Sequence, residues 1–510
     1  MKARLNWLDR AIGVVSPKAA LMRGLARGAI DAQRAYDGAA KGRHTEGWRT
    51  RPTSADTEIG AALPLLRDRQ RDLERNNPHA RKAKTVWQNN LVGTGIRPRA
   101  KGGNANAKRA VELWEEWGKQ ADADNQLDIY GLMDLAVGTM VSGGDSAIRR
   151  RLRLPTDGFK VPLQLQVMEG DLIDHTKNGI VSPGRTAIQG VEFDLIGSRT
   201  AYWMYQQHPG NINITGLDGL VSRPVPASEV IHLYRKERTQ TRGVPWGSAV
   251  VRELRDFDDY QAAEIIRKKT EACVVAIVIG ADEGQEGVAP SVLDANGTPV
   301  ESFEPGLIAY AHGGKDIKFN SPSSMGGFAD YKKVTLHTCA AGYLMPYELL
   351  TGDLSEVNFS SARVGLVEFR RLVETIQWLC IIPMMLDKIW AWFCEAAYFA
   401  GELPTADIPI EWDPPEFDSV NPIDDANADL INIRSGKMTL FEAIAKRGRD
   451  PIAVLEEHAV VAKLLDKLGL IFDSDPRRVS KGGNEQPSTS QQANEAANTQ
   501  PKPSRLQAVK

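Results

Sequence analysis

Residues 351–371 read TGDLSEVNFSSARVGLVEFRR and join a short polar stretch to a long apolar helical pattern. The polar half carries Asp353 and Glu356 among small side chains that are typical of turns. The second half leads into apolar residues at gaps of three and four, the spacing of one helix face. We therefore expect a surface loop followed by a long buried helix. The expected N-cap of that helix is Asn358, Ser360 or Ser361.

The helical pattern is long and contains a proline. Its apolar positions are Leu372, Ile376, Leu379, Ile382, Leu386, Ile389 and Phe393. Pro383 lacks a backbone donor and crowds the preceding turn, so we expect a kink there. The window from Ile376 to Cys394 is the most apolar in the chain, but it is short and includes Asp387 and Lys388. These features favour a helix buried in protein over a membrane span.

Length and composition describe a multidomain globular protein. The chain has 510 residues, more than the roughly 100–200 of one domain. A hydrophobic share of 42% with 25% charged residues excludes a wholly disordered or membrane-embedded protein. The cysteines lie far apart without the spacing of a zinc site, so we expect reduced thiols in a cytosolic chain. They are Cys273, Cys339, Cys380 and Cys394.

The two ends differ in charge. The formal net charge is -2, yet residues 1–100 carry 20 Lys and Arg against 9 Asp and Glu, an excess of 11 positive charges. Residues 1–55 show weak periodicity and no signal-peptide core, and we expect a poorly ordered basic arm. Residues 473–510 have almost no large apolar side chains, so they cannot offset the entropy of ordering and are expected to be disordered.

Helices come first and strands follow. Helical patterns cover 61–96, 107–122 and 127–145, with a new helix beginning at Pro78 after an asparagine cap and glycines closing each segment. β-Branched and aromatic residues with partial alternation then predict strands. These strands cover 146–152, 162–169, 189–195, 201–207 and 229–236. The fold class is α+β, mainly helical, with a first domain that ends near Tyr234.

A charged helix is predicted over 248–272. Three pairs at i,i+4 favour it: Arg252 with Asp256, Arg255 with Asp259, and Glu264 with Lys268. Its apolar stripe is narrow and indicates packing against neighbours rather than within a thick core. The stripe consists of Val250, Leu254, Phe257 and Ile265.

A β-rich insertion and further helices follow. Residues 273–280, 306–310 and 316–319 predict strands within 273–326. The next helix, over 328–344, should stop at Pro346. Residues 424–470 predict at least two short helices with Gly and Pro punctuation.

The sequence contains few motifs that indicate catalysis or metal binding. No P-loop, H-E-x-x-H or G-x-S-x-G motif occurs, so we expect neither an enzyme nor a cofactor. The strongest acidic group is EGDLIDH, residues 169–175, which could surround a divalent cation. Its candidate ligands are Glu169, Asp171, Asp174 and His175. A solvated polar turn at a strand end is the more usual role of such a group.

Residues 67–99 form a basic segment with two interpretations. Clustered Lys and Arg can neutralise nucleic-acid phosphates. The interleaved Asp68, Asp72 and Glu74 instead favour a solvated helix face. Aromatic residues that would stack bases do not alternate with these charges.

Five stretches in order resemble the lambda-type portal proteins of tailed phages. The most specific is NFSSARVGLVEFRR at 358–371. The others are ERNNPHARKAKTVWQNNLVGTGI (74–96), LWEEW with ADADNQLD (113–128), TQTRGVPW (239–246) and DYKKVTLHTCAAGYLMPYELLTGDL (330–354). The resemblance spans about residues 60–470. Residues 1–50 match nothing in that family.

The resemblance implies a portal fold with named regions. The wing would be 56–246 together with 361–423, which hold the kinked helix and the return to the wing. The two stem helices would be 247–272 and 327–344, joined by the clip at 273–326. A tunnel loop would be 345–360 and a crown 424–472.

The resemblance also implies the setting and the partners. Twelve identical chains would form a ring at the capsid portal vertex of the virion, assembled in the host cytoplasm, with double-stranded DNA passing through without sequence specificity. The expected protein partners are the terminase large subunit, the major capsid or scaffold protein and a head-completion or adaptor protein. No membrane is expected.

The resemblance gives the opening stretch a channel role. Its expected DNA-channel residues are Asp353, Ser355, Glu356, Asn358, Ser360 and Ser361. Because DNA is a dense polyanion, carboxylates in this loop would repel it while small polar groups form weak, exchangeable bonds. Capping and turn formation alone would also explain these residues.

Two other functions stay open at this stage. A metal-dependent nuclease would use the acidic group at 169–175. A monomeric DNA-binding protein would use the basic first hundred residues and would show steeply salt-dependent affinity.

Overall fold

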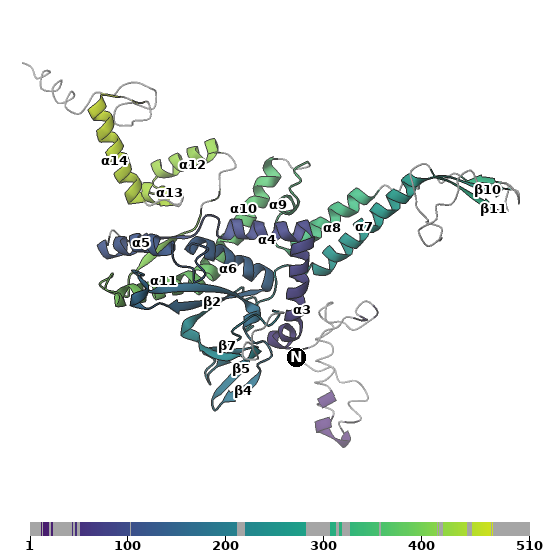
Figure 1. Cartoon of the computed structure of the whole chain (residues 1–510), viewed down its shortest axis with the longest axis horizontal. Coiled ribbons are helices and arrows are strands. Elements are labelled where there is room, and N and C mark those ends of the chain that lie inside the picture. The colour runs from purple at the N-terminus through teal and green to yellow at the C-terminus, as the bar shows by residue number, and fades with distance from the viewer. Residues whose placement is uncertain are drawn as a thin grey trace, which may run out of the picture. The chain divides into compact units, whose positions relative to one another are not determined.

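The computed structural model describes most of the chain (Figure 1). The described residues are 12, 14–19, 22–23, 43, 46–47, 52–101, 104–211, 220–281, 307–312, 316–318, 327–355, 359–415, 417, 422–445, 451–470 and 472. Most of the expected arm at 1–55 and all of the expected tail at 473–510 lie outside them. Contacts divide the chain into two units, residues 1–58 and 59–510. In the first unit, short helical stretches lie between residues 12 and 23.

The next four helices have ends that the sequence explains. They are α3 (Ala55–Asn76), α4 (Pro78–Leu91), α5 (Ala105–Gly118) and α6 (Ile129–Gly143). The Oδ1 of Asn77 accepts hydrogen bonds from the backbone N–H groups of His79 and Ala80, at 2.9 and 3.0 Å, which confirms the predicted cap before Pro78. Gly95 has φ +109°, and a Cβ there would lie 2.2 Å from the Tyr130 ring, so only glycine fits.

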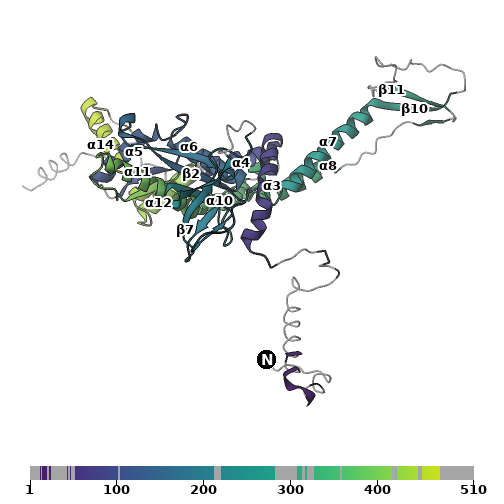
Figure 2. The ribbon, with the colours of Figure 1, turned by 60° about the horizontal axis from the view of Figure 1, so that its bottom comes forward.

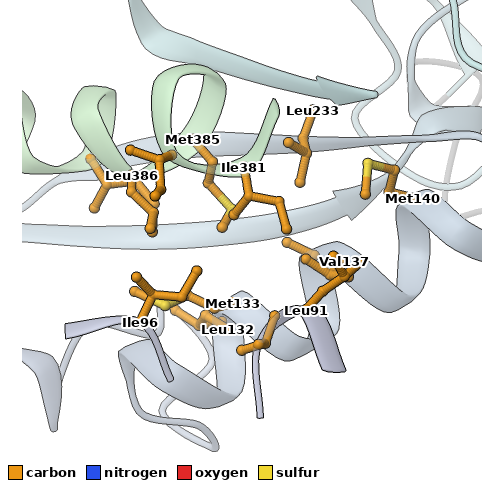
Figure 3. Packing of buried hydrophobic residues seen from close by; sticks show 14 of the residues in the cluster. Leu91, Ile96, Leu132, Met133, Val137, Met140, Leu233, Ile381, Met385 and Leu386 are labelled. Carbon is orange, nitrogen blue, oxygen red and sulfur yellow. The ribbon is translucent and has the colours of Figure 1, made fainter. Parts of the chain in front are cut away.

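A three-stranded antiparallel sheet has β2 (Asp145–Leu152) at its centre. β3 (Leu163–Glu169) pairs on one side of it and β9 (Val230–Tyr234) on the other. These strands confirm the predictions at 146–152, 162–169 and 229–236. In Figure 3, Leu132, Met133 and Val137 of α6 pack toward this sheet, with Leu233 of β9 close by.

A five-stranded antiparallel sheet covers a second, smaller core. In order it contains β4 (Gly179–Ser182), β5 (Arg185–Ile188), β6 (Val191–Phe193), β7 (Arg199–Met204) and β8 (Arg223–Pro226). β6 and β7 match predicted strands. β4, β5 and β8 were missed because each has only four residues and carries glycine, arginine or proline in place of an alternating apolar run.

The long C-terminal helical pattern forms three consecutive segments. They are α10 (Phe359–Ile376), the π-helical segment η8 (Gln377–Leu386) and α11 (Asp387–Phe399). Pro383 lies in the π-helix, where the wider turn accommodates its missing N–H, so the predicted irregularity takes the form of a π-helical segment. A π-helix has more residues per turn than an α-helix. Side chains within and after it therefore point in other directions around the helix axis than a regular α-helical spacing predicts. Leu379 is therefore 74% exposed, contrary to the prediction, whereas Leu386 and Phe393 are fully buried.

The main core joins both halves of the chain. Ile381, Met385 and Leu386 of η8 lie close to Leu233, with α6 nearby, in Figure 3. A tryptophan cluster continues this core, with Trp114 of α5 in ring contact with Trp117, Trp390, Phe393 and Trp412. Trp412 belongs to β13 (Ile410–Asp413), which pairs with β1 (Arg97–Ala100). The described side chains of Cys339, Cys380 and Cys394 are buried free thiols, as predicted.

Helices α7 (Val251–Cys273) and α8 (Phe328–Gly342) lie side by side and antiparallel (Figures 1 and 2). Tyr260 contacts Tyr331 and Phe328, at ring-centroid distances of 4.6 and 5.9 Å. Two of the three predicted ion pairs form, at 3.6 Å for Arg252 with Asp256 and 3.2 Å for Arg255 with Asp259.

Two details of α7 differ from the sequence prediction. Glu264 pairs with Arg267 at 2.6 Å, since the guanidinium one turn away can donate two hydrogen bonds where Lys268 has a single ammonium. Ile265 of the predicted stripe is 55% exposed, although Val250, Leu254 and Phe257 are buried. The core contact of α7 is therefore confined to its first half.

The remaining elements agree with the predicted order. A three-stranded sheet consists of β10 (Val274–Ala281), β11 (Leu307–His312) and β12 (Asp316–Lys318), with β10 parallel to β11 and antiparallel to β12. Three helices follow later, α12 (Pro422–Arg434), α13 (Leu440–Ala445) and α14 (Pro451–Leu468). Among the described helices, none combines the length and the apolarity that a bilayer crossing requires.

A buried carboxylate ties several elements together. Asp145, at the start of β2, is fully buried and accepts hydrogen bonds from Arg67 of α3 at 2.5 Å, from Arg242 at 2.5 Å and from His232 of β9 at 3.0 Å. Burial alone would favour the neutral acid, but the guanidinium groups of Arg242 and Arg67 hold the pKa of Asp145 well below its usual value. We call these four residues the Asp145 cluster.

His232 must be neutral in this cluster. Its Nδ1 lies 2.8 Å from Nη1 of Arg199, which can only donate, so the ring proton belongs on Nε2 toward Asp145. Burial lowers the pKa of His232 to about 4, and the charges of Arg199 and Arg242 contribute although Asp145 opposes them.

This arrangement predicts acid-sensitive stability. Below about pH 6.5 the unfolded chain protonates His232, whereas the folded protein does so only near pH 4. The free energy of unfolding should therefore fall between these values, by a total on the order of 3 kcal/mol. Guanidinium unfolding at pH 7, 6 and 5, followed by tryptophan fluorescence, measures it. The His232→Gln variant should lose this part of the slope, and His458→Gln, at an exposed position of α14, should keep it. Equal slopes in all three proteins would contradict the assignment.

Candidate functional site

The candidate site is the segment that follows α8, which we call the connecting segment, residues 343–361. Its first residue is fixed by contacts with the N-terminal helices. Trp87 of α4 donates its indole N–H to the carbonyl of Tyr343 at 3.0 Å, and Gln70 of α3 donates to the Tyr343 hydroxyl at 3.0 Å. Tyr343 is 1% exposed, so the connecting segment starts from a rigid point.

A short helix lies within this expected loop. α9 (Tyr347–Thr351) follows Pro346, which is its N-cap residue. The prediction that Pro346 stops the preceding helix is wrong in position, because α8 already ends at Gly342 and Leu344 adopts φ +57°. Leu350 is fully buried, and α9 packs against α4. The middle of the connecting segment is therefore anchored to the core.

A tight turn follows α9 and presents Asp353. Gly352 has φ +77°, which favours glycine. The carboxylate of Asp353 accepts a hydrogen bond from the backbone N–H of Ser355 at 3.0 Å, and the Thr351 hydroxyl accepts one from the backbone N–H of Asp353 at 3.1 Å. Hydrogen bonds from Ser355, with smaller contributions from Tyr347 and Lys333, lower the pKa of Asp353. Its charge is therefore held on an exposed turn at neutral pH.

Basic and aromatic side chains lie behind the turn. Lys333 of α8 adds a favourable charge to Asp353, and a Cβ at Gly352 would lie 2.8 Å from Nζ of Lys82. His337 stacks on Tyr347 with ring centroids 4.0 Å apart. The described part of the connecting segment is thus of mixed charge and not uniformly acidic. Sequence reasoning missed Lys82 and Lys333, although the Lys332-Lys333 pair one turn before His337 was a visible signal.

The structure agrees with the predictions for some of the site residues and not for others. Asp353 and Ser355 share the turn, as their spacing predicted. Glu356 and Asn358 lie outside the described residues. Ser360 and Ser361 lie inside α10, which begins at Phe359, so neither is the N-cap, and that prediction is wrong for both. A cap must precede the first helical residue, which leaves Asn358 as the predicted cap.

Only two members of the acidic group at 169–175 come together, since Glu169 and Asp171 place oxygens within 4.8 Å of each other and of a ring nitrogen of His208. Arg71 pairs with both Glu169 at 3.1 Å and Asp171 at 2.5 Å. Asp174 instead accepts hydrogen bonds from Ser222 at 2.5 Å and from Thr176 at 2.6 Å. His208, not His175, approaches Glu169, at 3.2 Å. A guanidinium between the carboxylates already offsets their charge, which disfavours a divalent cation there.

The basic segment 67–99 is largely used inside the fold. Arg67 is buried in the Asp145 cluster. Lys84 pairs with Glu74 at 3.4 Å, and Arg99 pairs with Glu411 at 2.7 Å and with Asp413 at 2.9 Å. These ion pairs do not support a nucleic-acid footprint over this segment.

The sequence comparison now decides the family. Residues 41–377 match the family described as phage portal protein, lambda family. The chain belongs to this family. The resemblance of the five sequence stretches is therefore confirmed, although the match begins at residue 41 and so includes ten residues for which we expected none. The connecting segment lies inside the matched region.

The comparisons also give individual proteins to which the chain is similar. The chain is 26% identical over 467 residues to a probable portal protein of Halomonas phage phiHAP-1, and the match covers 86% of this chain and 88% of that protein. Among solved structures it is similar to the neck of an empty gene transfer agent particle computed with C6 symmetry, at 16% identity and a TM-score of 0.45, covering 74% of this chain and 92% of the other. The virion of a native gene transfer agent particle matches at 16% identity and a TM-score of 0.42, covering 81% and 97%. The phage portal family to which the chain belongs is a family of structural proteins.

The anchoring of α9 yields a test in this portal protein. Leu350→Ala should leave a cavity between α9 and α4 and lower the free energy of unfolding by about 2–5 kcal/mol. The Leu354→Ala variant is the matched control, because Leu354 is 67% exposed on the same segment and its truncation should change stability by less than about 0.5 kcal/mol. Denaturant unfolding measures both, and equal stabilities would show that α9 is not anchored as described.

Proposed function

We propose that this portal protein forms a closed ring of twelve copies at the capsid portal vertex of a phage particle, through which double-stranded DNA passes. The observation that carries the proposal is membership of the portal family together with the surface of the paired helices α7 and α8. Ile265 and Ile266 of α7 and Val334 of α8 are 55%, 64% and 66% exposed in one chain. Apolar side chains on an otherwise charged helix pair are best buried against a neighbouring copy.

The elements support an assignment of regions. The wing comprises 56–246 and 361–423, and the stem helices comprise 247–272 and 327–344, which contain most of α7 and all of α8. The clip is 273–326, whose described part is the β10–β12 sheet. The tunnel segment is 345–360, and the crown is 424–472, which includes most of α12 and all of α13 and α14.

The partners follow from these regions. The clip is proposed to contact the terminase large subunit during packaging and a head-completion or adaptor protein afterwards. The wing is proposed to contact the major capsid or scaffold protein. The ring would assemble in the host cytoplasm and remain in the virion.

The connecting segment suggests how DNA slides. A ring of ionised Asp353 side chains would repel phosphates, while the Ser355 side chains offer weak, exchangeable hydrogen bonds. Lys82 and Lys333 lie behind this turn and limit the repulsion. The repulsion by Asp353 and the attraction by the two lysines would together keep DNA in the channel without binding it tightly through counterion release.

Ring assembly can be tested at the stem. The purified chain should have a mass near twelve copies and appear as rings in negative-stain microscopy. Ile266→Glu together with Val334→Glu should break the ring into smaller species, because buried carboxylates without partners oppose association. Leu195→Glu changes an apolar residue that is 88% exposed in the β6–β7 turn and should leave the ring intact. A wild-type chain that is monomeric under all conditions would contradict the proposal.

The channel role can be tested in packaging. Asp353→Lys with Glu356→Lys should slow DNA translocation or impair release, because lysines would bind phosphates by counterion release. A matched pair, Asp68→Lys with Glu112→Lys, changes exposed charges on α3 and α5 and should package normally. Measured packaging rates and particle infectivity report the outcome. Wild-type behaviour in the double lysine variant would remove the repulsion mechanism while leaving the ring untouched.

A further inference from the structure

Three arginines lie in a row on one face of the central strand β2. Successive side chains on a strand alternate between faces, so Arg149 and Arg151 share a face, and Arg153 continues the row where its N–H donates to the Pro162 carbonyl at 2.9 Å. Arg150 points to the other face, where it pairs with Glu395 at 2.8 Å and lies over the Trp392 ring. We call Arg149, Arg151 and Arg153 the arginine row.

The arginine row lacks acidic partners. Arg151 donates two hydrogen bonds to the amide oxygen of Gln166, at 3.0 and 2.5 Å, and Arg153 donates one to Gln164 at 2.6 Å. The Nε of Arg149 is buried without an acceptor. Within the part of the chain that the structure describes, no carboxylate lies within 4.0 Å of these three guanidinium groups. This differs from Arg67, Arg71 and Arg99, each of which pairs with an aspartate.

The neutral partners are held in place by the fold. Gln164 is fully buried, and its amide N–H group donates to the carbonyls of Gln120 and Asp122 at 2.9 Å each. Its oxygen is therefore fixed toward Arg153. The carboxylate of Asp122, in the loop beside these residues, is engaged within its own loop, where it accepts hydrogen bonds from the backbone N–H groups of Asp124, Gln126 and Leu127 at 3.0, 3.1 and 3.0 Å.

A groove of about 600 Å³ lies beside the arginine row. Arg151, Arg153 and Gln166 line it together with three leucines, Leu127, Leu135 and Leu152. These leucines are 39%, 43% and 67% exposed. Asp122 and Asp124 also line the groove, and Glu229 lies close enough to act on Arg151 electrostatically, but none of the three forms an ion pair with Arg151 or Arg153. The surface therefore combines guanidinium groups that have no paired carboxylate with exposed aliphatic side chains.

We propose that this groove binds an acidic, leucine-bearing peptide segment of a partner protein. Guanidinium groups bind carboxylates with paired, charge-assisted hydrogen bonds, and Arg151 and Arg153 are two residues apart, roughly 7 Å along the strand. An extended peptide places its own residues i and i+2 at that spacing, so glutamates at alternate positions match the two arginines. The intervening apolar side chains then reach the exposed leucines. A DNA backbone would leave those leucines uncovered, which favours the peptide. The proposal does not depend on ring formation.

Fluorescence anisotropy with the purified full chain tests this groove. The probe is a labelled 12-residue peptide of alternating Glu and Leu. Arg151→Gln with Arg153→Gln should weaken its binding at least tenfold, because two charge-assisted contacts are lost. Arg223→Gln is the matched control, since Arg223 is exposed on β8, and it should change the affinity less than twofold. The tryptophan fluorescence of each variant reports folding.

Changes to the probe keep the test decisive if the variant does not fold. On the wild-type chain, a Gln/Leu peptide should bind at least tenfold more weakly than the Glu/Leu peptide, and a Glu/Ser peptide severalfold more weakly. Leu152→Ser should weaken the Glu/Leu peptide without affecting the Glu/Ser peptide. Equal affinity for the Gln/Leu and Glu/Leu peptides would overturn the proposal. So would a DNA duplex that binds more tightly than the peptide and loses affinity in the arginine variant.

Discussion

The buried carboxylate of Asp145 is the constraint on which the rest of the fold depends. A fully buried charge is tolerated only when hydrogen-bonded and paired, and here two arginines and a histidine supply that compensation. These partners come from α3, from β9 and from the loop that precedes α7, so the same contact fixes four parts of the chain. Arg242 also donates to the carbonyl of Gly170, at 2.5 Å, and to that of Gln189, at 3.0 Å, which connects the cluster to the end of β3 and to the turn between β5 and β6. Removing Arg67 or Arg242 would weaken this charge compensation, and removing the neutral His232 would take one hydrogen-bond donor from the buried carboxylate.

Arginines whose charge is balanced by an acidic partner inside the fold have a structural role, and they differ in this from arginines that are free to bind other molecules. In the Asp145 cluster every guanidinium is used, and basic residues of the 67–99 segment pair with acids inside the fold. On β2 the arginine row has amide partners only. At the connecting segment one carboxylate is exposed with lysines behind it. A count of charges along the chain does not reveal these differences, which appear only when the partners of each group are known.

Local signals in the sequence predicted the helices well, and long-range effects explain the failures. Asn77 before Pro78, and the glycines after α4 and α6, set helix ends through backbone geometry that depends on near neighbours. Leu379 was assigned to the buried face on the assumption of regular α-helical spacing. The π-helical segment around Pro383 changes that spacing, and Leu379 is exposed. For the candidate site, the turn at Asp353 followed from sequence, whereas α9 and Lys82 did not, because packing against a segment some 270 positions earlier has no local pattern. The role of Asp145 was not predicted, since nothing beside it in the sequence shows that it is buried.

The junction of α7 and α8 has a further consequence. Gly342 lies against Val250, and a Cβ at Gly247 would lie 2.4 Å from the Tyr343 hydroxyl, so the chain leaves the core and returns to it at nearly the same place. The chain between Gly247 and Gly342 therefore forms an excursion, that is, a segment whose two ends are both held by contacts with the core. Insertions, deletions or exchanges in its distal part therefore add little loop-closure entropy and leave the anchoring residues undisturbed. Evolution can therefore remodel this excursion independently of the rest of the protein, and a designer could graft a foreign hairpin in its place.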